Sequence, residues 1–384
     1  MRRKICLIIT SRGNYAKMSS IIKAMANHPE LEPQIVVGGG ALLSKYGAIA
    51  DAMRQQGIRI DRMVHFLVEG ETPVTMAKSA GVAVSEFSTA FDNLKPDVVV
   101  VLADRFECLP AAMTAAYMNI PVAHIEGGEV SGSIDESIRH AITKLAHVHF
   151  PATSDAAKRI ARMGEEPETI FPVGATSLDA LCQLDLTDIS PMKELQLTTG
   201  VGEVVDLSGD YLLAIQHPVT TEYAQNLNNI RQTVAAIEEL RMPTIWIWPN
   251  MDAGSDGISK GIREFRENKR PDYIHFFKGL AIEHYGPLLN NAACIVGNSS
   301  SGIRESAFLG VPAVNIGIRQ GGRERGHNVI DVGYDRAAIV DAVRRQVVHG
   351  RYEPDLIYGD GKAGSRVVEI VKDFSFTIQK RITY

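Results

Sequence analysis

The sequence predicts an α/β protein with two doubly wound, Rossmann-like domains that face a cleft. Short apolar runs, typical of parallel strands buried on both faces, alternate with longer helical patterns. This alternation stops in a polar, irregular stretch at 187–209 and then starts again, which indicates two halves of similar architecture. The length of 384 residues also suits two domains, or three. Two such domains would bring the carboxyl ends of their strands to one cleft, where open α/β sheets bind ligands.

The first half contains the clearest strand patterns. Apolar and β-branched runs predict strands at 4–10, 34–40, 58–64, 97–103 and 120–125, with shorter ones at 149–154 and 170–173. Apolar residues at helical spacing predict helices at 18–25, 47–56, 75–93 and 108–118, and another that begins near Ile134. Residues 11–17 are expected to form the first strand–helix loop.

The second half repeats this architecture without a residue-level repeat. Strands are expected at 211–215, 244–248, 273–277, 294–296, 313–316 and 329–332, and helices at 220–240, 282–290, 302–308 and 336–348. The tail at 362–378 again has a helical period. We therefore expect an N-terminal domain at 1–175, a C-terminal domain at 176–365, and a helix at 366–384 that packs back on the N-terminal domain.

The composition is that of a soluble globular protein, with 45% hydrophobic and 22% charged residues. A formal net charge of −5 gives no reason to expect a nucleic-acid partner. No apolar run approaches the roughly 20 residues of a membrane helix, so no membrane association is expected. The apolar run at 5–9 is too short for a signal peptide.

The cysteines give no sign of a metal centre. They are far apart in the chain and form no CxxC pair: Cys6, Cys108, Cys182 and Cys294. We expect reduced, mostly buried thiols in a cytoplasmic protein and no metal site.

The stretch at 123–149 concentrates ionisable side chains at the end of a predicted strand. Its loop contains Glu126 and Glu129, and the helix that follows begins with Asp135 and Glu136 and continues to Arg139. So many acids at a strand end indicate a site of proton transfer. The alternative is a solvated loop that leads into a helix whose N-terminal dipole favours acids.

Other strand ends carry groups that suit a phosphate. Ser299 and Ser300 follow a short strand and precede a predicted helix, where backbone N–H groups bind anions, although a serine there is also a common helix cap. Glu305, one turn later, could accept hydrogen bonds from a sugar or ribose. Arg319 could add positive charge to the same pocket.

Two further places carry candidate groups. Arg12 and Lys17 lie in the first predicted loop, where a cationic pair fits a diphosphate or is surface charge. His217 ends a strand, and is either structural or a group that holds a leaving group or moves a proton. The glycines at 38–40 and the first loop match neither a dinucleotide fingerprint nor a Walker A loop, so neither NAD nor ATP is expected as a cofactor.

Together these motifs resemble the hydrolysing UDP-N-acetylglucosamine 2-epimerases, over about residues 3–367. The resemblance rests on DRF at 104–106, IEGGEVSGSIDESIRHAITKLAH at 125–147, QHPVTT at 216–221, PNMDAG at 249–254, and GNSS at 297–300 with the later Arg319. The longest of these is similar to the epimerase half of the animal bifunctional enzyme of sialic acid synthesis. There is no room here for that enzyme's kinase domain.

The resemblance implies a glycosyltransferase-B-like fold and the conversion of UDP-N-acetylglucosamine and water to UDP and free N-acetylmannosamine. UDP would leave by anti elimination to 2-acetamidoglucal, and water would then add to that intermediate. The resemblance implies no cofactor and no metal. It also implies two partners, a UDP-sugar and further copies of the chain in a dimer or tetramer.

Matching positions imply the site residues, although which acid removes the C2 proton stays open. The catalytic groups are Asp104, Glu126, Asp135, His217, Glu129, Glu136 and Arg139. The UDP-binding groups are Arg12, Lys17, Arg105, His217, Asn250, Asp252, Ser299, Ser300, Glu305 and Arg319. The chain departs from many relatives in two loops: RGNY at 12–15 replaces Arg-Ala-Asp-Tyr, and EGGE at 126–129 replaces His-Gly-Gly-Glu.

Three alternatives remain open. The substrate could be UDP-2,4-diacetamido-2,4,6-trideoxyglucose, as in legionaminic acid synthesis. A glycosyltransferase of the same fold needs at most one base, and the acids at 126–136 argue against it. A non-catalytic nucleotide-sugar sensor would bind the substrate without releasing UDP.

Overall fold

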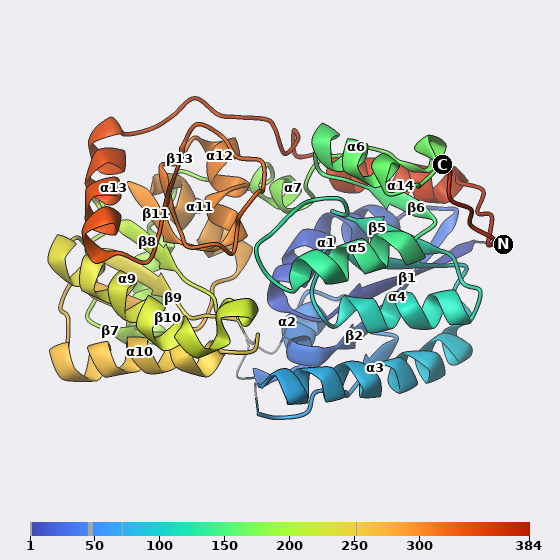
Figure 1. Cartoon of the computed structure of the whole chain (residues 1–384), viewed down its shortest axis with the longest axis horizontal. Coiled ribbons are helices and arrows are strands. Elements are labelled where there is room, and N and C mark those ends of the chain that lie inside the picture. Colours follow the sequence, from blue (N-terminus) through green and yellow to red (C-terminus); the bar gives the residue numbers. More distant parts are fainter. Residues whose placement is uncertain (1, 45–48, 71, 251) are drawn as a thin grey trace. The chain divides into compact units, whose positions relative to one another are not determined.

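The computed structural model describes residues 2–44, 49–70, 72–250 and 252–384. It contains two compact units, each built around one sheet (Figure 1). Unit 1 comprises Met1–Glu129, Ile134–Cys182 and Tyr358–Tyr384, and unit 2 comprises Val130–Ser133 and Gln183–Ile357. The domain limits expected from the sequence, at 175 and 365, stay predictions.

The sheet of unit 1 has six parallel strands in the order β3-β2-β1-β4-β5-β6. They are β1 (Arg3–Ile9), β2 (Leu31–Gly38), β3 (Arg62–Val64), β4 (Val98–Leu102), β5 (Val122–Ile125) and β6 (Val148–Phe150). The strand order reverses between β1 and β4. In a doubly wound sheet this reversal opens a crevice at the carboxyl ends of the two strands, where ligands bind.

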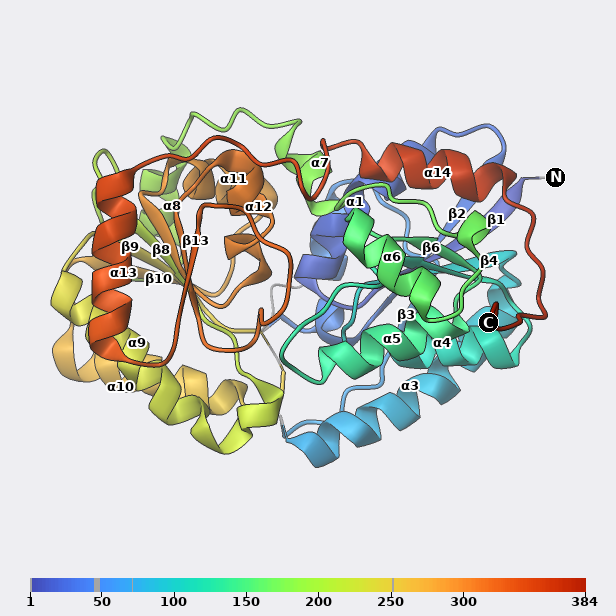
Figure 2. The ribbon, with the colours of Figure 1, turned by 45° about the horizontal axis from the view of Figure 1, so that its top comes forward.

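Helices cover both faces of this sheet (Figure 2). They are α1 (Arg12–Ala26), α2 (Ile49–Gln55), α3 (Pro73–Leu94), α4 (Cys108–Tyr117), α5 (Asp135–Leu145), α6 (Ser154–Arg162), α7 (Ser177–Leu181) and α14 (Ala363–Asp373). α3, α4 and α5 lie side by side, and α1 packs against α7 and α14. Leu7 of β1, Met18 of α1 and Val367 of α14 share one buried core, so the last helix completes a face of the first sheet.

Unit 2 repeats the same topology. Its strands are β7 (Val201–Gly202), β8 (Leu212–Ile215), β9 (Thr244–Ile247), β10 (Ile274–Phe277), β11 (Cys294–Gly297), β12 (Ala313–Ile316) and β13 (Val329–Val332). The order is β13-β12-β11-β8-β9-β10-β7, with only the short edge strand β7 antiparallel to its neighbour. The reversal therefore falls between β8 and β11. The predicted fold class, α/β with two doubly wound Rossmann-like domains, is confirmed.

The helices of unit 2 are α8 (Pro191–Thr198), α9 (Asn226–Leu240), α10 (Ser255–Lys269), α11 (Ile282–Asn291), α12 (Glu305–Leu309) and α13 (Arg336–His349). α9 packs against both α10 and α13. Trp246 of β9 is fully buried in the core that these helices form with the sheet.

Several local predictions are wrong. Residues 12–17 belong to α1 rather than to a loop. Ser11 accepts a hydrogen bond from the Asn14 N–H at 3.2 Å and caps a helix that begins at Arg12, six residues before the predicted start. Residues 170–173 form no strand beyond one isolated bridge, between His149 and Ile170. The stretch at 187–209 contains α8 and β7.

Helices α6 and α10 were not predicted from the sequence. Both are rich in charged residues, yet α10 keeps buried Ile258, Ile262 and Phe265 on one face at helical spacing. The helix predicted at 47–56 begins at Gly47, and the PNMDAG motif at 249–254 contains Met251. Gly47 and Met251 lie outside the described residues.

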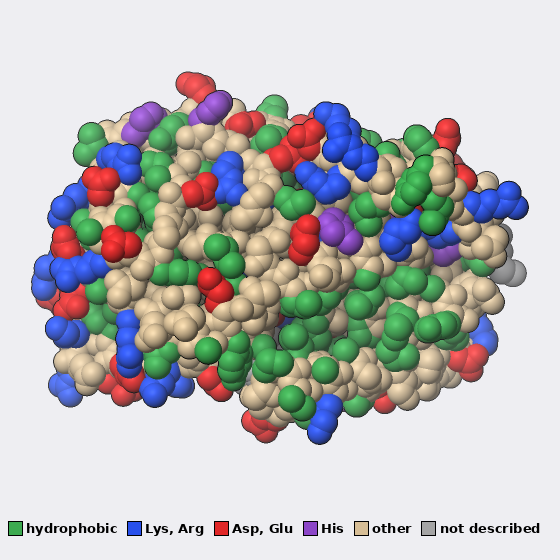
Figure 3. Space-filling model, viewed as in Figure 1, with side chains coloured by type: hydrophobic (Ala, Val, Ile, Leu, Met, Phe, Trp, Pro, Cys, Tyr) green, Lys and Arg blue, Asp and Glu red, His purple; other side chains and the backbone are tan. Residues whose placement is uncertain are grey.

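Figure 3 shows a group of apolar side chains on the surface over α3 and α4. Among the exposed hydrophobic residues of these helices are Val82 and Tyr117. Within the described parts of the chain, every helix is too short or too polar to cross a bilayer.

Candidate active site

The candidate acids of unit 1 follow β4 and β5, where the backbone is strained. Ala103 and Glu126, the first residues after these strands, have φ values of 61° and 58°. Such left-handed conformations are rare outside glycine and cluster at functional sites. Here the Ala103 N–H donates to the Ile125 carbonyl at 2.8 Å, and the Glu126 N–H donates to the Phe150 carbonyl at 2.9 Å. Sheet hydrogen bonds thus hold the chain in the turns that present Asp104 and Glu126.

Arg139 gathers three acidic residues around one buried guanidinium. Its side chain is fully buried on α5 and forms an ion pair with Asp104. Its Nη1 donates to Glu136 Oε2 and to the Glu129 carbonyl, each at 2.9 Å. Burial alone would lower the pKa of Arg139, but the carboxylates of Asp104, Glu129 and Glu136 outweigh it and raise that pKa. Arg139 is therefore a permanent cation that holds Asp104 beside the first turn of α5.

Lys17 holds the second candidate acid. Its Nζ lies 2.7 Å from Oε2 of Glu126, whose side chain is fully buried. The sequence places Lys17 among the UDP-binding groups, and the structure places its ammonium on a candidate catalytic carboxylate. Arg105 likewise forms a two-point ion pair with buried Glu107, at 3.0 and 3.2 Å. These cations balance buried charge within unit 1.

His124 shapes the loop between Glu126 and Glu129. Its Nε2 lies 2.9 Å from the Ala103 carbonyl and its Nδ1 lies 3.3 Å from Thr143 Oγ1. A Cβ on Gly127 would lie 2.7 Å from this ring, and one on Gly128, which has a φ of 76°, would lie 2.4 Å from the Ala156 carbonyl. The two glycines are therefore required for the loop to pass this close to His124 and α6.

The buried His124 predicts acid sensitivity of this region. Burial lowers the pKa of the imidazole to about 3, whereas a histidine in the unfolded chain titrates near 6.5. Between these values the unfolded chain binds the additional proton, so stability falls as the pH falls. From pH 6.5 to 5 the wild type should lose about 2 kcal/mol more than His124→Gln. Hydrogen exchange of the β4 and β5 amides at both pH values measures this difference. Equal losses in the two proteins would contradict it.

In unit 2 the corresponding strand ends hold His217. Asn298, which follows β11, accepts the His217 N–H through Oδ1 at 2.7 Å and donates through Nδ2 to the His217 carbonyl at 2.9 Å. His217 Nδ1 accepts the Asn250 N–H at 3.1 Å, so the proton of the neutral ring is on Nε2. Gly297 allows this approach, because a Cβ there would lie 1.9 Å from the Ile215 carbonyl. His217 is thus fixed at the switch point between β8 and β11.

The remaining predicted groups of unit 2 lie near this histidine in the fold. Asn250 Nδ2 donates to Asp252 Oδ2 at 2.6 Å. Arg319 Nη1 and Gln320 Nε2 both donate to the Asn298 carbonyl, at 3.2 and 2.9 Å. Arg319 is therefore tied to the same strand end as His217.

Several buried acceptors in unit 2 lack a hydrogen-bond partner within the described part of the chain. Three of them, Gln216 Oε1, Asn250 Oδ1 and Glu305 Oε2, are on residues that follow β8, β9 and β11. An unsatisfied buried polar atom costs about 1–3 kcal/mol, and native proteins carry few of them. Three along one sheet edge indicate a ligand that donates hydrogen bonds.

The serine loop differs from its prediction. The helix expected after Ser300 is a short 3₁₀ turn (η5, Ser300–Gly302) followed by the five-residue α12. Ser299 accepts the Ser301 N–H at 3.3 Å, which is the capping role weighed as the alternative. Phosphate binding by Ser299 and Ser300 stays a prediction.

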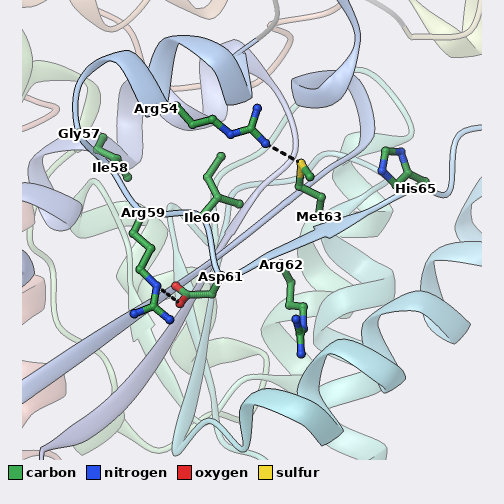
Figure 4. A pocket seen from close by; sticks show the side chains of 9 residues that line it. All are labelled: Arg54, Gly57, Ile58, Arg59, Ile60, Asp61, Arg62, Met63 and His65. Carbon is green, nitrogen blue, oxygen red and sulfur yellow. Dashed lines mark hydrogen bonds and ion pairs between the residues drawn. The ribbon is translucent and has the colours of Figure 1, made fainter.

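A separate open hollow of about 530 Å³ lies in unit 1, beside the end of α2 and the edge strand β3 (Figure 4). Arg54 and Arg62 point to opposite sides of it. Arg59 forms an ion pair with Asp61 at 3.1 Å. The arginine side chains that line this hollow do not converge on one point, so the hollow is a poor candidate for the active site.

No metal centre is found among residues 2–44, 49–70, 72–250 and 252–384, where no three His, Cys, Asp or Glu side chains are arranged to hold an ion. The cysteines are free thiols, of which Cys182 is exposed.

The structure thus brings the predicted residues into two sets. Asp104, Glu126, Glu129, Glu136 and Arg139 lie together in unit 1 with Lys17. Asp135, the first residue of α5, is half-buried and directly precedes Glu136 in the sequence. Arg12 begins α1, and burial lowers the pKa of its guanidinium.

The second set is the group around His217 in unit 2. Asn298 and Gln320 hold this group together, but neither was predicted as a site residue, although Asn298 stands in the GNSS motif. The signal for Asn298 was its place directly after a strand-ending glycine. Gln320 gave no signal of its own, because its partner is a backbone carbonyl.

Two doubly wound units with polar groups at both switch points define an α/β protein with paired Rossmann-like domains, a class that binds ligands at the carboxyl ends of its strands. A family model described as UDP-N-acetylglucosamine 2-epimerase matches residues 23–372. The chain belongs to the UDP-N-acetylglucosamine 2-epimerase family.

Individual relatives match nearly the whole chain. A UDP-N,N'-diacetylbacillosamine 2-epimerase (hydrolyzing) of Legionella pneumophila is 34% identical over 372 residues, covering 97% of this chain and 96% of the relative. A UDP-N-acetylglucosamine 2-epimerase of Neisseria meningitidis is 30% identical over 387 residues, covering 99% and 98%. The crystal structure of UDP-GlcNAc 2-epimerase from Neisseria meningitidis bound to UDP-GlcNAc has a TM-score of 0.79 at 17% identity, covering 96% of this chain and 99% of that one. The chain is therefore a UDP-sugar 2-epimerase by family and fold.

Proposed function

We propose that the protein is a hydrolysing 2-epimerase that converts UDP-N-acetylglucosamine and water to N-acetylmannosamine and UDP. The observation that carries this proposal is the grouping of candidate acids at the carboxyl ends of β4 and β5, held by Lys17 and Arg139. Burying carboxylates costs free energy even when they are paired. A protein that only binds a nucleotide sugar needs no such group, whereas elimination and hydration need several proton carriers.

In the proposed first step, a carboxylate removes the proton from C2 of the sugar. The C2–H electrons form the C1=C2 double bond, the C1–O bond breaks, and its electron pair leaves with UDP. Glu126, Asp104 and Asp135 are the proposed proton carriers. Lys17 orients Glu126 and Arg139 orients Asp104, so these two acids have fixed positions.

In the second step, water adds across the double bond of 2-acetamidoglucal. Its hydroxyl bonds to C1 and a proton is delivered to C2 on the face that gives the manno configuration. Glu129 and Glu136 neighbour the proposed carriers and are further candidates for this proton transfer.

The groups of unit 2 are proposed to bind the nucleotide. His217 presents a protonated Nε2 in its neutral form, which suits donation to the departing diphosphate. Arg319 supplies a cation from the strand end that fixes His217. The unpartnered oxygens of Asn250 and Glu305 suit the donor groups of uracil and ribose.

A second candidate substrate is the UDP-linked 2,4-diacetamido-2,4,6-trideoxy sugar. The name of the Legionella relative favours this sugar. That relative is 34% identical to this chain, and the UDP-N-acetylglucosamine enzyme of Neisseria is 30% identical. Incubation with each UDP-sugar, followed by assay of free UDP and free sugar, distinguishes the two. Turnover of the diacetamido sugar alone would replace the first proposal. A glycosyltransferase would release no free sugar from the donor without an acceptor.

A further inference from the structure

Helix α1 carries one polar residue on its buried face. The buried positions of this helix are Asn14, Met18, Ile21, Ile22 and Met25, which follow the helical period. The four later residues are apolar and join the core of unit 1. Asn14 is equally buried, with 3% of its surface exposed. Packing alone therefore does not explain an amide at this position.

The amide of Asn14 has no hydrogen-bond partner among the residues that the structure describes. Both Nδ2 and Oδ1 are buried and unpartnered. The backbone N–H of Asn14, in contrast, donates to the Ser11 hydroxyl at 3.2 Å. Most buried side-chain polar atoms are partnered in native proteins, and an amide that lacks partners for both of its atoms is an exception that requires a cause.

The position of Asn14 supplies a cause. It lies in the first turn of α1, directly after β1, and therefore at the carboxyl edge of the sheet beside the β1–β4 switch point. Lys17 is three residues later on the same helix, so the two side chains are neighbours. The Lys17 ammonium lies 2.7 Å from Glu126. Asn14 is thus next to the candidate acids of unit 1.

The two unmet hydrogen bonds restrict what can bind there. Nδ2 needs an acceptor and Oδ1 needs a donor. An ionised diphosphate offers only acceptors, so it would leave Oδ1 unsatisfied. A sugar hydroxyl or acetamido group offers both. We propose that the Asn14 amide binds a neutral hydroxyl or acetamido group of the substrate's sugar, an assignment that rests on the proposed function.

The substitution Asn14→Leu tests this, with Gln346→Met as the matched control. Gln346 is a buried amide of unit 2 that is fully partnered, by the Ala313 and Asn328 carbonyls and the Tyr352 hydroxyl. Asn14→Leu should lower kcat/KM for the UDP-sugar by about tenfold or more, leave the Kd for UDP within about twofold, and leave the melting temperature unchanged or raised. Gln346→Met should lower the melting temperature by about 4 °C or more at near wild-type kcat/KM.

Three results would overturn the assignment: wild-type kcat/KM in Asn14→Leu, an equal loss of affinity for UDP and for the UDP-sugar, or a fall in melting temperature like that of Gln346→Met. If the wild-type protein turns over neither UDP-sugar, the proposed function fails, and binding alone decides this inference. The ratio of the Kd for UDP to the Kd for UDP-N-acetylglucosamine should then fall about tenfold in Asn14→Leu. An unchanged ratio refutes the sugar contact.

Discussion

Replacing Glu126 by glutamine should lower the rate of UDP release by about a hundredfold or more. The amide has the shape of the carboxylate but cannot take up a proton, and it loses the ion pair with Lys17. The effect should appear in kcat, because the proposed role is in proton transfer and not in holding the nucleotide. Steady-state kinetics with the UDP-sugar, together with the Kd for UDP, measures both quantities.

Glu165→Gln is the matched control for this variant. Glu165 is also buried and paired with lysines, Lys144 and Lys380, near the carboxyl end of α5. Burial raises the pKa of its carboxyl, but hydrogen bonds from His149 and the two lysines outweigh this and lower that pKa to about 2. Glu165→Gln should therefore lose stability while keeping most of kcat. If both variants lose kcat equally, Glu126 has no special role in the chemistry.

The second large effect is expected from Arg139→Met. The methionine fills much of the volume but leaves Asp104, Glu136 and the Glu129 carbonyl without their shared cation. Removing one partner of a buried ion pair typically destabilises a protein by about 3–5 kcal/mol. UDP release should also fall by about a hundredfold or more, because Asp104 is no longer held in place.

Arg139→Lys separates charge from geometry in the same site. A lysine keeps the positive charge but cannot bond Asp104, Glu136 and the Glu129 carbonyl with one planar group. It should recover part of the stability and little of the activity. Chemical unfolding and steady-state kinetics of both variants check this. Full activity in Arg139→Lys would show that a point charge suffices and that the orientation of Asp104 is unimportant.

The architecture was predictable because both sheets, apart from the edge strand β7, are parallel and covered by helices on both faces. Their strands appear as continuous apolar runs, such as 98–102, and the long connections between them have a clear helical period. What the sequence did not give was the start of α1, where the capping hydroxyl of Ser11 decides the boundary. The polar helix α10 was missed because its few buried residues are separated by charged ones.

The candidate site was predictable in its acids and less so in what holds them. Acids after β4 and β5 are visible in the sequence, and Arg139 lies three residues after Glu136 on the same helix face. The pairing of Lys17 with Glu126 joins α1 to the loop after β5, and no local pattern encodes that contact. The same is true of Asn298, whose amide bonds both backbone groups of His217 across 81 residues of chain.

The most direct test of the proposed reaction is proton NMR of the sugar product formed from UDP-N-acetylglucosamine in deuterated water. Elimination removes the original C2 hydrogen and hydration returns a solvent one, so the product should be free N-acetylmannosamine with deuterium at C2, together with UDP. A product that retains the original hydrogen at C2, or a sugar that stays linked to UDP, would contradict hydrolysis by elimination and hydration.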